Sequence, residues 1–289
     1  MAEQKVAVIT GASSGIGKET AKAFVARGWH VIGTGRDPAR SAASEAEIRG
    51  FLANGGRFDM LRGDMALMAE TMRIAGEIKA LTSRIDVLIN NAGGVRDARY
   101  VTAEGTEETF TANHLAPFLL TRELLPLLRA TATVGQPGDV RVLATSSLAY
   151  QSSAGMNWDD IQHLHGDFPA SGVYCEAKLA NVLFSHELSK RISGDGIAAQ
   201  SLIPGVVHTN FASHGDENMQ GYLKDAPGKT PAQVAETLVW MATAPETGLP
   251  GARHFYDMQE QAIQPHAADD AASARLWTES EKLLAGLGY

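Results

Sequence analysis

The chain has 289 residues, of which 44% are hydrophobic and 20% charged, the composition of a globular protein with ample apolar material for a core. This length can hold one large α/β domain or two ordinary ones. The net charge of −8 argues against a nucleic-acid coat or a polybasic membrane anchor, although a local basic pocket for an anionic ligand stays possible.

Three further features bear on the cellular compartment. The single cysteine, Cys175, cannot form an intramolecular disulfide, is typical of a reducing compartment, and is expected to be packed rather than catalytic. The first predicted strand begins within about five residues of the first residue, so no signal peptide is expected. No run of about eighteen apolar residues predicts a membrane span. We therefore expect a soluble cytoplasmic protein.

The first stretch of the chain combines a short apolar run, three glycines and a helical pattern. Val6–Ile9 is rich in β-branched residues, as buried strands are, and Gly11, Gly15 and Gly17 follow it. Apolar residues then recur at helical spacing through Phe24. A strand, a glycine turn and a helix point free N–H groups and the positive end of a helix dipole at an anion such as a pyrophosphate. The same spacing also suits an ordinary tight turn.

The residues after the second predicted strand, His30–Thr34, indicate which dinucleotide would bind. In a dinucleotide-binding fold the end of this strand faces the adenosine ribose, where an NAD enzyme needs a carboxylate. This chain has Gly35 there, followed by Arg36, whose guanidinium can bind a 2′-phosphate. Arg36 therefore predicts NADP, although many loop arginines are simply solvated. Asp37 is expected to cap the helix that opens at Pro38.

The next segments continue the alternation of helices and strands. A helix is predicted to continue through Glu45–Asn54, and strands are predicted at Arg57–Leu61 and Ile85–Asn90. Between these strands, Asp64 could accept a hydrogen bond from an adenine amino group or could cap the helix Leu67–Leu81. The sequence alone does not choose between these two roles.

A run of small residues and asparagines, Asn90-Asn91-Ala92-Gly93-Gly94, follows the fourth strand. It lets the chain pass close to a flat group, or it forms an ordinary turn. A long helix is predicted over Thr106–Leu128, with a kink near Asn113 caused by Pro117. Asn113 could bond a carbonyl freed by the kink and hold a water, or could simply be a buried residue at the kink.

The predicted fifth strand, Val140–Thr145, delivers Ser146-Ser147 at its carboxyl end, where open α/β sheets place their ligands. Residues 148–172 then interrupt the alternation and are predicted to be a loop insertion. His163 and His165 lie in it near several aspartates. Their spacing matches no firm metal-ligand pattern, so a surface loop is the preferred interpretation and no metal is expected.

The C-terminal part begins with a strong helical pattern over Tyr174–Ile192. The sixth strand, Ile197–Ile203, runs into Pro204-Gly205 and Thr209. Residues 211–229 lack periodicity and contain three glycines, as a mobile substrate lid would. The last predicted elements are the helix Pro231–Ala242, the strand Arg253–Tyr256 and the helix Asp269–Leu284. We expect a single domain spanning 1–289, an α/β Rossmann-type doubly wound parallel sheet of about seven strands with helices on both faces.

These motifs, taken in order along the chain, resemble those of the short-chain dehydrogenase/reductases of the classical type. The matching pieces are Thr10-Gly11-Ala12-Ser13-Ser14-Gly15-Ile16-Gly17, Asn90-Asn91-Ala92-Gly93, Asn113, Ser147, Tyr174-x-x-x-Lys178 and Pro204-Gly205. Any one of them is weak, but the ordered set covers nearly the whole chain and is specific.

Within that family the chain is most similar to the retinol dehydrogenase-like branch. The similar segments are Asn113–Thr121, Arg141–Leu148 and Tyr174–Leu183, together with the long spacer between Ser147 and Tyr174. The branch usually has a serine where Glu176 stands, and a histidine and a glycine within the segment that reads Leu115-Ala116-Pro117 here. The proline could alter how a water is held at Asn113.

The resemblance implies an NADP(H)-dependent oxidoreductase that acts on a carbonyl or alcohol of a small molecule, and it leaves the substrate open. It implies four catalytic residues, Asn113, Ser147, Tyr174 and Lys178. The cofactor-binding residues that it implies are Gly11, Ser13, Ser14, Gly15, Ile16, Gly17, Arg36, Asp64, Met65, Asn91, Ala92, Gly93, Tyr174, Lys178, Pro204, Gly205, Val207 and Thr209.

The proposed chemistry centres on Tyr174 and Lys178, which a helix places on one face because they are four residues apart. Hydride transfer to a carbonyl produces an alkoxide, which needs a proton donor and positive surroundings. An ammonium about 4 Å from the phenol would lower the phenol pKa from about 10 to about 7 at an effective dielectric constant of about 20. Ser147 would orient the substrate oxygen, Asn113 would hold a water leading to solvent, and Lys178 would also bind the nicotinamide ribose.

Assembly and substrate are predicted more loosely. The apolar side of Tyr174–Ile192, with Thr106–Leu128, predicts a homodimer or homotetramer. Residues 148–172 and 211–229 are expected to build the pocket, and their Met, Trp and Phe content favours a lipophilic or aromatic substrate. No nucleic acid is expected as a partner. Two alternatives stay open: a reductase of C=C bonds in conjugated rings, as in the related protochlorophyllide reductases, and a non-catalytic NADP-sensing or scaffold protein.

Overall fold

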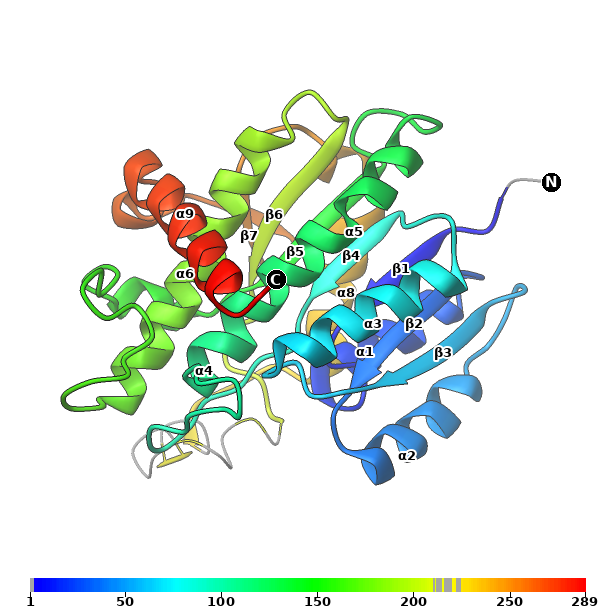
Figure 1. The fold of residues 1–289 in the computed structure, drawn as a ribbon. Coiled ribbons are helices and arrows are strands. Elements are labelled where there is room, and N and C mark those ends of the chain that lie inside the picture. Colours follow the sequence, from blue (N-terminus) through cyan, green and yellow to red (C-terminus); the bar gives the residue numbers. More distant parts are fainter. Residues whose placement is uncertain (1–2, 210, 212–214, 216–219, 222–224) are drawn as a thin grey trace.

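One central sheet organises the fold (Figure 1). The computed structural model describes residues 3–209, 211, 215, 220–221 and 225–289. Its strands are β1 (Val6–Ile9), β2 (His30–Gly35), β3 (Arg57–Arg62), β4 (Val87–Asn90), β5 (Val140–Thr145), β6 (Ile197–Ile203), β7 (Arg253–Tyr256) and β8 (Gln259–Gln261). Their order across the sheet is β3-β2-β1-β4-β5-β6-β7-β8, with only the β7–β8 pair antiparallel in the part described. The predicted doubly wound, mostly parallel sheet is confirmed.

Helices cover both faces of this sheet. The α-helices of the described part are α1 (Gly15–Val25), α2 (Pro38–Arg49), α3 (Met68–Leu81), α4 (Glu108–Phe110), α5 (Ala116–Ala132), α6 (Ala170–Arg191), α8 (Pro231–Thr243) and α9 (Asp270–Gly286). Side chains of α1 and α8 form one apolar cluster with the sheet, and those of α3, α5 and α6 form another. The alternation along β1 supplies both clusters, since Ala7 and Ile9 lie in the first and Val6 and Val8 in the second.

The strand order changes direction at β1. This strand pairs in parallel with β2 on one side and with β4 on the other. The loops that leave the carboxyl ends of β1 and β4 therefore diverge and leave a crevice between them. In open α/β sheets this is the place where ligands bind.

Several predicted helix boundaries are wrong by a turn or more. The helix predicted through Asn54 ends at Arg49, and Asn54 (φ 52°) and Gly55 (φ 81°) form a left-handed turn after it. Helix α6 begins at Ala170, one turn before the predicted start at Tyr174. At the start of α2 the prediction is confirmed, because Asp37 Oδ1 accepts a hydrogen bond from Arg40 N at 2.7 Å.

The predicted kink near Asn113 is a π-helical turn. This turn covers Thr111–Leu115 between α4 and α5, and the N–H of Ala116 closes it by donating to the carbonyl of Thr111. Pro117 has no N–H to donate back into the preceding turn, so the α-helical ladder is broken there. The side chain of Asn113 donates from Nδ2 to the carbonyl of Thr109 at 2.7 Å, as expected for a carbonyl freed by the break.

Helix α9 covers the face on which the dimer prediction depended. Trp277 of α9 packs edge-on against Phe118 of α5 (ring centroids 4.7 Å apart) and stacks over Phe184 of α6 (6.1 Å). A buried hydrogen bond of 2.7 Å joins His114 Nε2 to Ser280 Oγ, and Figure 1 shows α9 lying across α6. The apolar side of these helices is therefore not exposed, and pairing of two copies through it loses its basis.

Two further predictions concern the substrate lid and a membrane span. The lid predicted over 211–229 falls largely outside the described residues. None of the described helices is both long and apolar enough to cross a lipid bilayer.

Candidate active site

A cavity of about 730 Å³ opens at the carboxyl ends of the parallel strands. It is lined by most of the residues predicted to bind a cofactor or to act in catalysis. These are Gly11, Ser13, Ser14, Gly15, Ile16, Arg36, Asp64, Met65, Asn91, Ala92, Gly93, Ser147, Tyr174, Lys178, Pro204, Gly205, Val207 and Thr209. Two predicted residues, Gly17 and Asn113, do not line it.

The glycine turn after β1 brings the backbone to the cavity wall. Gly11 (φ 73°) and Gly15 (φ 52°) are left-handed, and a Cβ at Gly11 would lie 3.1 Å from the Cα of Ala92. Gly17 lies behind the turn. A Cβ there would lie 2.4 Å from the carbonyl oxygen of Gly11, so Gly17 lets α1 pack against the turn.

The loop after β4 is pinned beside this turn by Thr10. Its Oγ1 accepts hydrogen bonds from the N–H groups of Asn91 (3.0 Å) and Ala92 (2.9 Å). In return, Asn91 Nδ2 donates to the carbonyl of Thr10 at 3.0 Å. The two loops that flank the crevice are thereby held together, and Thr10 is a positioning residue that the predicted site set omitted.

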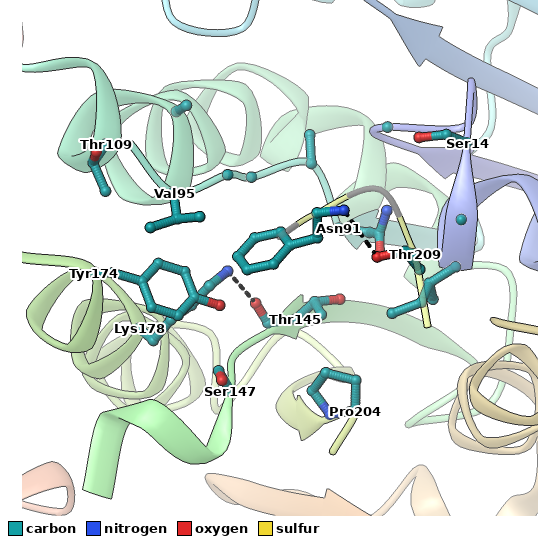
Figure 2. Close-up of a pocket in the computed structure, with 18 of the residues that line it drawn as sticks. Ser14, Asn91, Val95, Thr109, Thr145, Ser147, Tyr174, Lys178, Pro204 and Thr209 are labelled. Carbon is teal, nitrogen blue, oxygen red and sulfur yellow. Dashed lines mark hydrogen bonds between the residues drawn. The ribbon is translucent and has the colours of Figure 1, made fainter. Parts of the chain in front are cut away.

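Ser147, Tyr174 and Lys178 meet on one wall of the cavity (Figure 2). Helix α6 carries Tyr174 and, one turn later, Lys178, whereas Ser147 follows β5 and caps a 3₁₀ turn by accepting from the N–H of Ala149. Lys178 Nζ donates to the carbonyl of Thr145 at 3.2 Å and lies 5.6 Å from the centre of the Tyr174 ring. The spacing of four residues therefore places the phenol and the amine together, as predicted.

Burial dominates the protonation of this pair. It raises the pKa of Tyr174 above the ordinary value, and a hydrogen bond with Ser147 opposes the rise. Burial also lowers the pKa of Lys178 to about 8. The lowered pKa predicted for the phenol is therefore not found in this geometry, because burial of the phenol has the largest effect on that pKa.

Asn113 lies directly behind the cavity wall. Its Nδ2 donates to the carbonyls of Thr109 and Gly94, each at 2.7 Å, and its Oδ1 is buried without a partner among the described residues. A Cβ added at Gly93 would lie 2.4 Å from this Oδ1 and 3.3 Å from Lys178 Nζ. Asn113 and Lys178 thus flank Gly93, and the orphaned oxygen is suited to the water that was predicted there.

At the end of the cavity next to the carboxyl ends of β2 and β3, Arg36 lies between two carboxylates. Its Nη1 is 3.3 Å from Glu108 Oε1 and 3.8 Å from Asp64 Oδ2. Glu108 also accepts a hydrogen bond from Arg96, and the predicted site set contained neither of these residues. Arg40 lines the same end and was missed as well.

The capping role considered for Asp64 is wrong. The first N–H groups of α3, at Met68 and Ala69, donate to the carboxylate of Glu104 at 2.6 and 2.9 Å. Asp64 Oδ1 instead accepts from the N–H of Ala66 at 3.0 Å, within its own loop. Of the two roles considered for Asp64, only the one at the cavity is left.

The insertion contributes less to the cavity than predicted. From its start come Leu148, Ala149 and Ser152, which line the wall near Tyr174. Its large side chains lie elsewhere: Met156 and Trp158 pack on the core, and Phe168 lies under the Arg99 guanidinium. The apolar lining includes Leu148 and Ala149 from the insertion and Phe211 from the predicted lid, together with Val95 and Ala112, which the sequence did not single out.

The histidines of the insertion have structural partners. His163 Nε2 lies 3.2 Å from Glu176 Oε2, and Asp160 accepts hydrogen bonds from the N–H groups of Leu164 and His165. Within the described ranges no three His, Cys, Asp or Glu side chains are grouped as metal ligands would be. The Glu176 carboxylate also accepts from Asn157 N at 2.8 Å, so this departure from the family pattern anchors the insertion to α6.

Comparisons with known proteins agree with this geometry. The family model described as short chain dehydrogenase matches residues 5–157. Human retinol dehydrogenase 13 is 33% identical over 287 aligned residues, which cover 97% of this chain and 84% of that protein. A solved structure of an uncharacterised protein from Mycobacterium paratuberculosis is similar over 97% of this chain and 93% of its own, with a TM-score of 0.74 and 29% identity. A short-chain dehydrogenase from Sphingobium yanoikuyae, solved with NADPH, shares the fold over 98% and 94% of the two chains, at a TM-score of 0.66 and 20% identity.

Proposed function

The chain belongs to the short-chain dehydrogenase family, in its retinol dehydrogenase-like branch, and from this premise we propose that it transfers a hydride between NADP(H) and a carbonyl or alcohol carbon of a lipophilic small molecule. The observation that carries the proposal is the meeting of Ser147, Tyr174 and Lys178 beside a glycine-walled cavity. Membership of this family indicates an oxidoreductase that acts on a CH–OH group and uses a nicotinamide cofactor. The preference for NADP, the lipophilic substrate and the role of Tyr174 are parts of the proposal.

The residues present fit such a cofactor. Gly35 and Gly93 both line the cavity, and packing requires glycine at each of them, since an added Cβ would lie 2.4 Å from Ser41 Oγ or Asn113 Oδ1. The side chain of Ser14, the N-cap of α1, does not bond the first N–H groups of that helix, which suits a pyrophosphate at the helix terminus. When bound, the nicotinamide supplies or accepts the hydride.

The chain's own residues handle the proton and the oxygen. In the direction of reduction, Ser147 holds the carbonyl oxygen, and Tyr174 gives it the phenolic proton as the carbon becomes an alcohol. Lys178 carries its charge below a pH of about 8, so at neutral pH an ammonium lies next to the phenolate that forms. The water suited to Asn113 Oδ1 returns a proton towards Tyr174 by way of Lys178. Oxidation of the alcohol runs the same steps backwards.

Cofactor and substrate preference rest on the two ends of the cavity. Arg36 and Arg40, which both line the cavity, support a 2′-phosphate at the adenosine end. Val95, Leu148 and Phe211 support an apolar substrate near Tyr174, and the Phe211 ring lies 5.4 Å from the Tyr174 ring. The cytoplasmic location and the homodimer or homotetramer stay predictions, and an oligomer would need a face other than the one covered by α9.

A panel of carbonyls and alcohols, assayed with NADPH, NADH and their oxidised forms, tests the proposal. We expect turnover of lipophilic ketones, aldehydes or alcohols. Tyr174→Phe should keep cofactor binding but lose turnover by about 100-fold or more, the usual worth of a general acid. Tyr100→Phe is the matched control, since Tyr100 is exposed and its hydroxyl bonds only to Asp97 among the described residues.

Two results would count against the proposal. Near-normal turnover by Tyr174→Phe would remove the phenol from the mechanism. Cofactor binding without turnover of any carbonyl or alcohol would favour the non-catalytic alternative, and turnover of conjugated alkenes alone would favour a C=C reductase.

A further inference from the structure

The groups around Arg36 form a charge cluster that joins three separate loops. Arg36 follows β2, Asp64 follows β3, Arg96 follows β4, and Glu108 opens α4. Glu108 Oε1 accepts from Arg96 and lies 3.3 Å from Arg36 Nη1, while Asp64 Oδ2 lies 3.8 Å from the same nitrogen. The two guanidinium groups and two carboxylates carry no net charge together. A phosphate that binds at Arg36 would therefore meet a guanidinium already paired with carboxylates, while Arg40 lines the same cavity outside this cluster.

We propose that Glu108 sets the cofactor preference of this chain by occupying Arg36 and so limiting its preference for NADP over NAD. This inference rests on the proposed function, because it concerns the adenosine end of the same cavity. Glu108 lines that cavity, and its side chain is only 18% exposed, against 47% for Arg36. The carboxylate is therefore more buried than the guanidinium with which it pairs.

A 2′-phosphate must compete with Glu108 for Arg36. Both are anionic acceptors for one guanidinium, and a second carboxylate, Asp64, lies on the same nitrogen. A 2′-hydroxyl carries no charge, so NADH can bind without displacing Glu108 from Arg36. The carboxylate of Glu108 thus costs NADPH binding energy and leaves NADH binding nearly unaffected.

Arg96 also pairs with Glu108, and this pairing weakens the competition between Glu108 and a 2′-phosphate for Arg36. Its hydrogen bond to Glu108 is the main cause of the raised pKa of Arg96, and its side chain is 20% exposed. Removing Arg96 would leave the Glu108 carboxylate to Arg36 alone. The two substitutions, at Glu108 and at Arg96, should therefore shift cofactor preference in opposite directions.

Direct binding of NADPH and NADH to the full chain, measured by titration calorimetry at fixed salt, tests the inference without any substrate. Glu108→Gln should lower the Kd for NADPH by about 3- to 10-fold, the size expected for one charge near a dianion in a partly hydrated site. The Kd for NADH should change by less than about twofold. Arg96→Gln should raise the Kd for NADPH, and it also provides a second variant if Glu108→Gln folds poorly.

Two further variants test whether Glu108 acts through Arg36 and control for the loss of a negative charge elsewhere. In an Arg36→Ala chain, the gain from Glu108→Gln should shrink to less than about half, because the two residues then no longer couple. Glu45→Gln removes the same charge from an exposed pair with Arg49 on α2 and should leave both Kd values unchanged.

The outcomes separate the inference from the proposed function. If the wild-type chain binds neither dinucleotide, the proposed function fails. If it binds both, and Glu108→Gln weakens NADPH or changes both cofactors equally, the inference is wrong and the proposed function stands. If Glu108→Gln lowers the Kd for NADPH as much in the Arg36→Ala chain as in the wild type, Glu108 does not act through Arg36 and the inference is wrong.

Discussion

Burial of the Lys178 amine lowers the stability of the folded chain at neutral pH. Burial lowers its pKa to about 8, while an unfolded lysine titrates near 10.5. Between these two values the unfolded chain binds more protons than the folded one, so stability rises with pH across this window. At neutral pH and below, the folded chain carries the full cost of a buried ammonium, whose charge the proposed chemistry requires.

Lys178→Met should therefore stabilise the chain while abolishing turnover. At pH 7 we expect the free energy of unfolding to rise by about 2 kcal/mol, less than the whole pKa shift because the hydrogen bond to the Thr145 carbonyl is lost. That carbonyl keeps a donor in Asn181 Nδ2 at 3.1 Å. Urea denaturation at pH 6.5, 8 and 9.5 measures the effect, which should diminish as the pH rises through 8.

The control for this prediction is Lys282→Met, at a side chain that is 65% exposed. It should change stability by less than about 0.5 kcal/mol at every pH. An effect of Lys178→Met that is the same at all three pH values would mean that lost charge burial is not its cause.

At the residue scale, the sequence predicted the positions of the candidate catalytic side chains better than the charges around them. Tyr174 and Lys178 could be found because residues four apart lie about one helical turn apart, and Ser147 because it follows the carboxyl end of a strand. Glu108 and Arg96 could not be found, since they reach Arg36 only through the approach of three loops. For the same reason the pKa of Tyr174 was predicted in the wrong direction: pair attraction is visible in the spacing, whereas desolvation depends on the packed surroundings.

At the scale of elements, helix α3 begins without a cap of its own. Its N-cap residue is Leu67, which offers no acceptor, and the carboxylate of Glu104 from a distant loop receives the N–H groups of Met68 and Ala69. Glu104→Ala should lower the free energy of unfolding by about 1–2 kcal/mol, as loss of a charged N-terminal cap does. Urea denaturation measures the loss, and faster hydrogen exchange in the first turn of α3 would locate it.

Glu279→Ala serves as the comparison for this cap. Glu279 pairs with Lys282 at 2.9 Å on the surface of α9, and such a pair contributes less than about 1 kcal/mol. Equal losses from the two substitutions would show that Glu104 acts only as an ordinary surface charge.

Element types were more predictable than element ends. Strand β1 is a continuous apolar run, which the pattern identifies directly. The kink at Pro117 was predicted, but its form as a π turn depends on how α5 packs. β8, Gln259–Gln261, was missed because its three polar residues are exposed or only half-buried and carry no apolar alternation.

At the scale of the whole molecule, α9 decides which surface is left for association. Its own pattern predicted a helix but not the place where that helix docks. In the structure Leu276, Trp277 and Leu284 join the core formed by α5 and α6. The apolar face that favoured a helix-paired dimer is therefore satisfied within one chain, and a sequence alone does not distinguish these two ways of burying it.

Trp277→Ala tests whether α9 acts as this internal cover. Trp277 is 9% exposed and contacts Phe118 and Phe184, so the substitution should cost about 3–4 kcal/mol of unfolding free energy. The uncovered rings should also promote association, visible in sedimentation velocity at micromolar concentration as species larger than those of the wild type. Trp277→Phe keeps an aromatic ring on the same face, so both the loss of unfolding free energy and the association should be smaller than in Trp277→Ala. If Trp277→Ala is destabilised yet sediments like the wild type, α9 contributes to stability without masking an association surface.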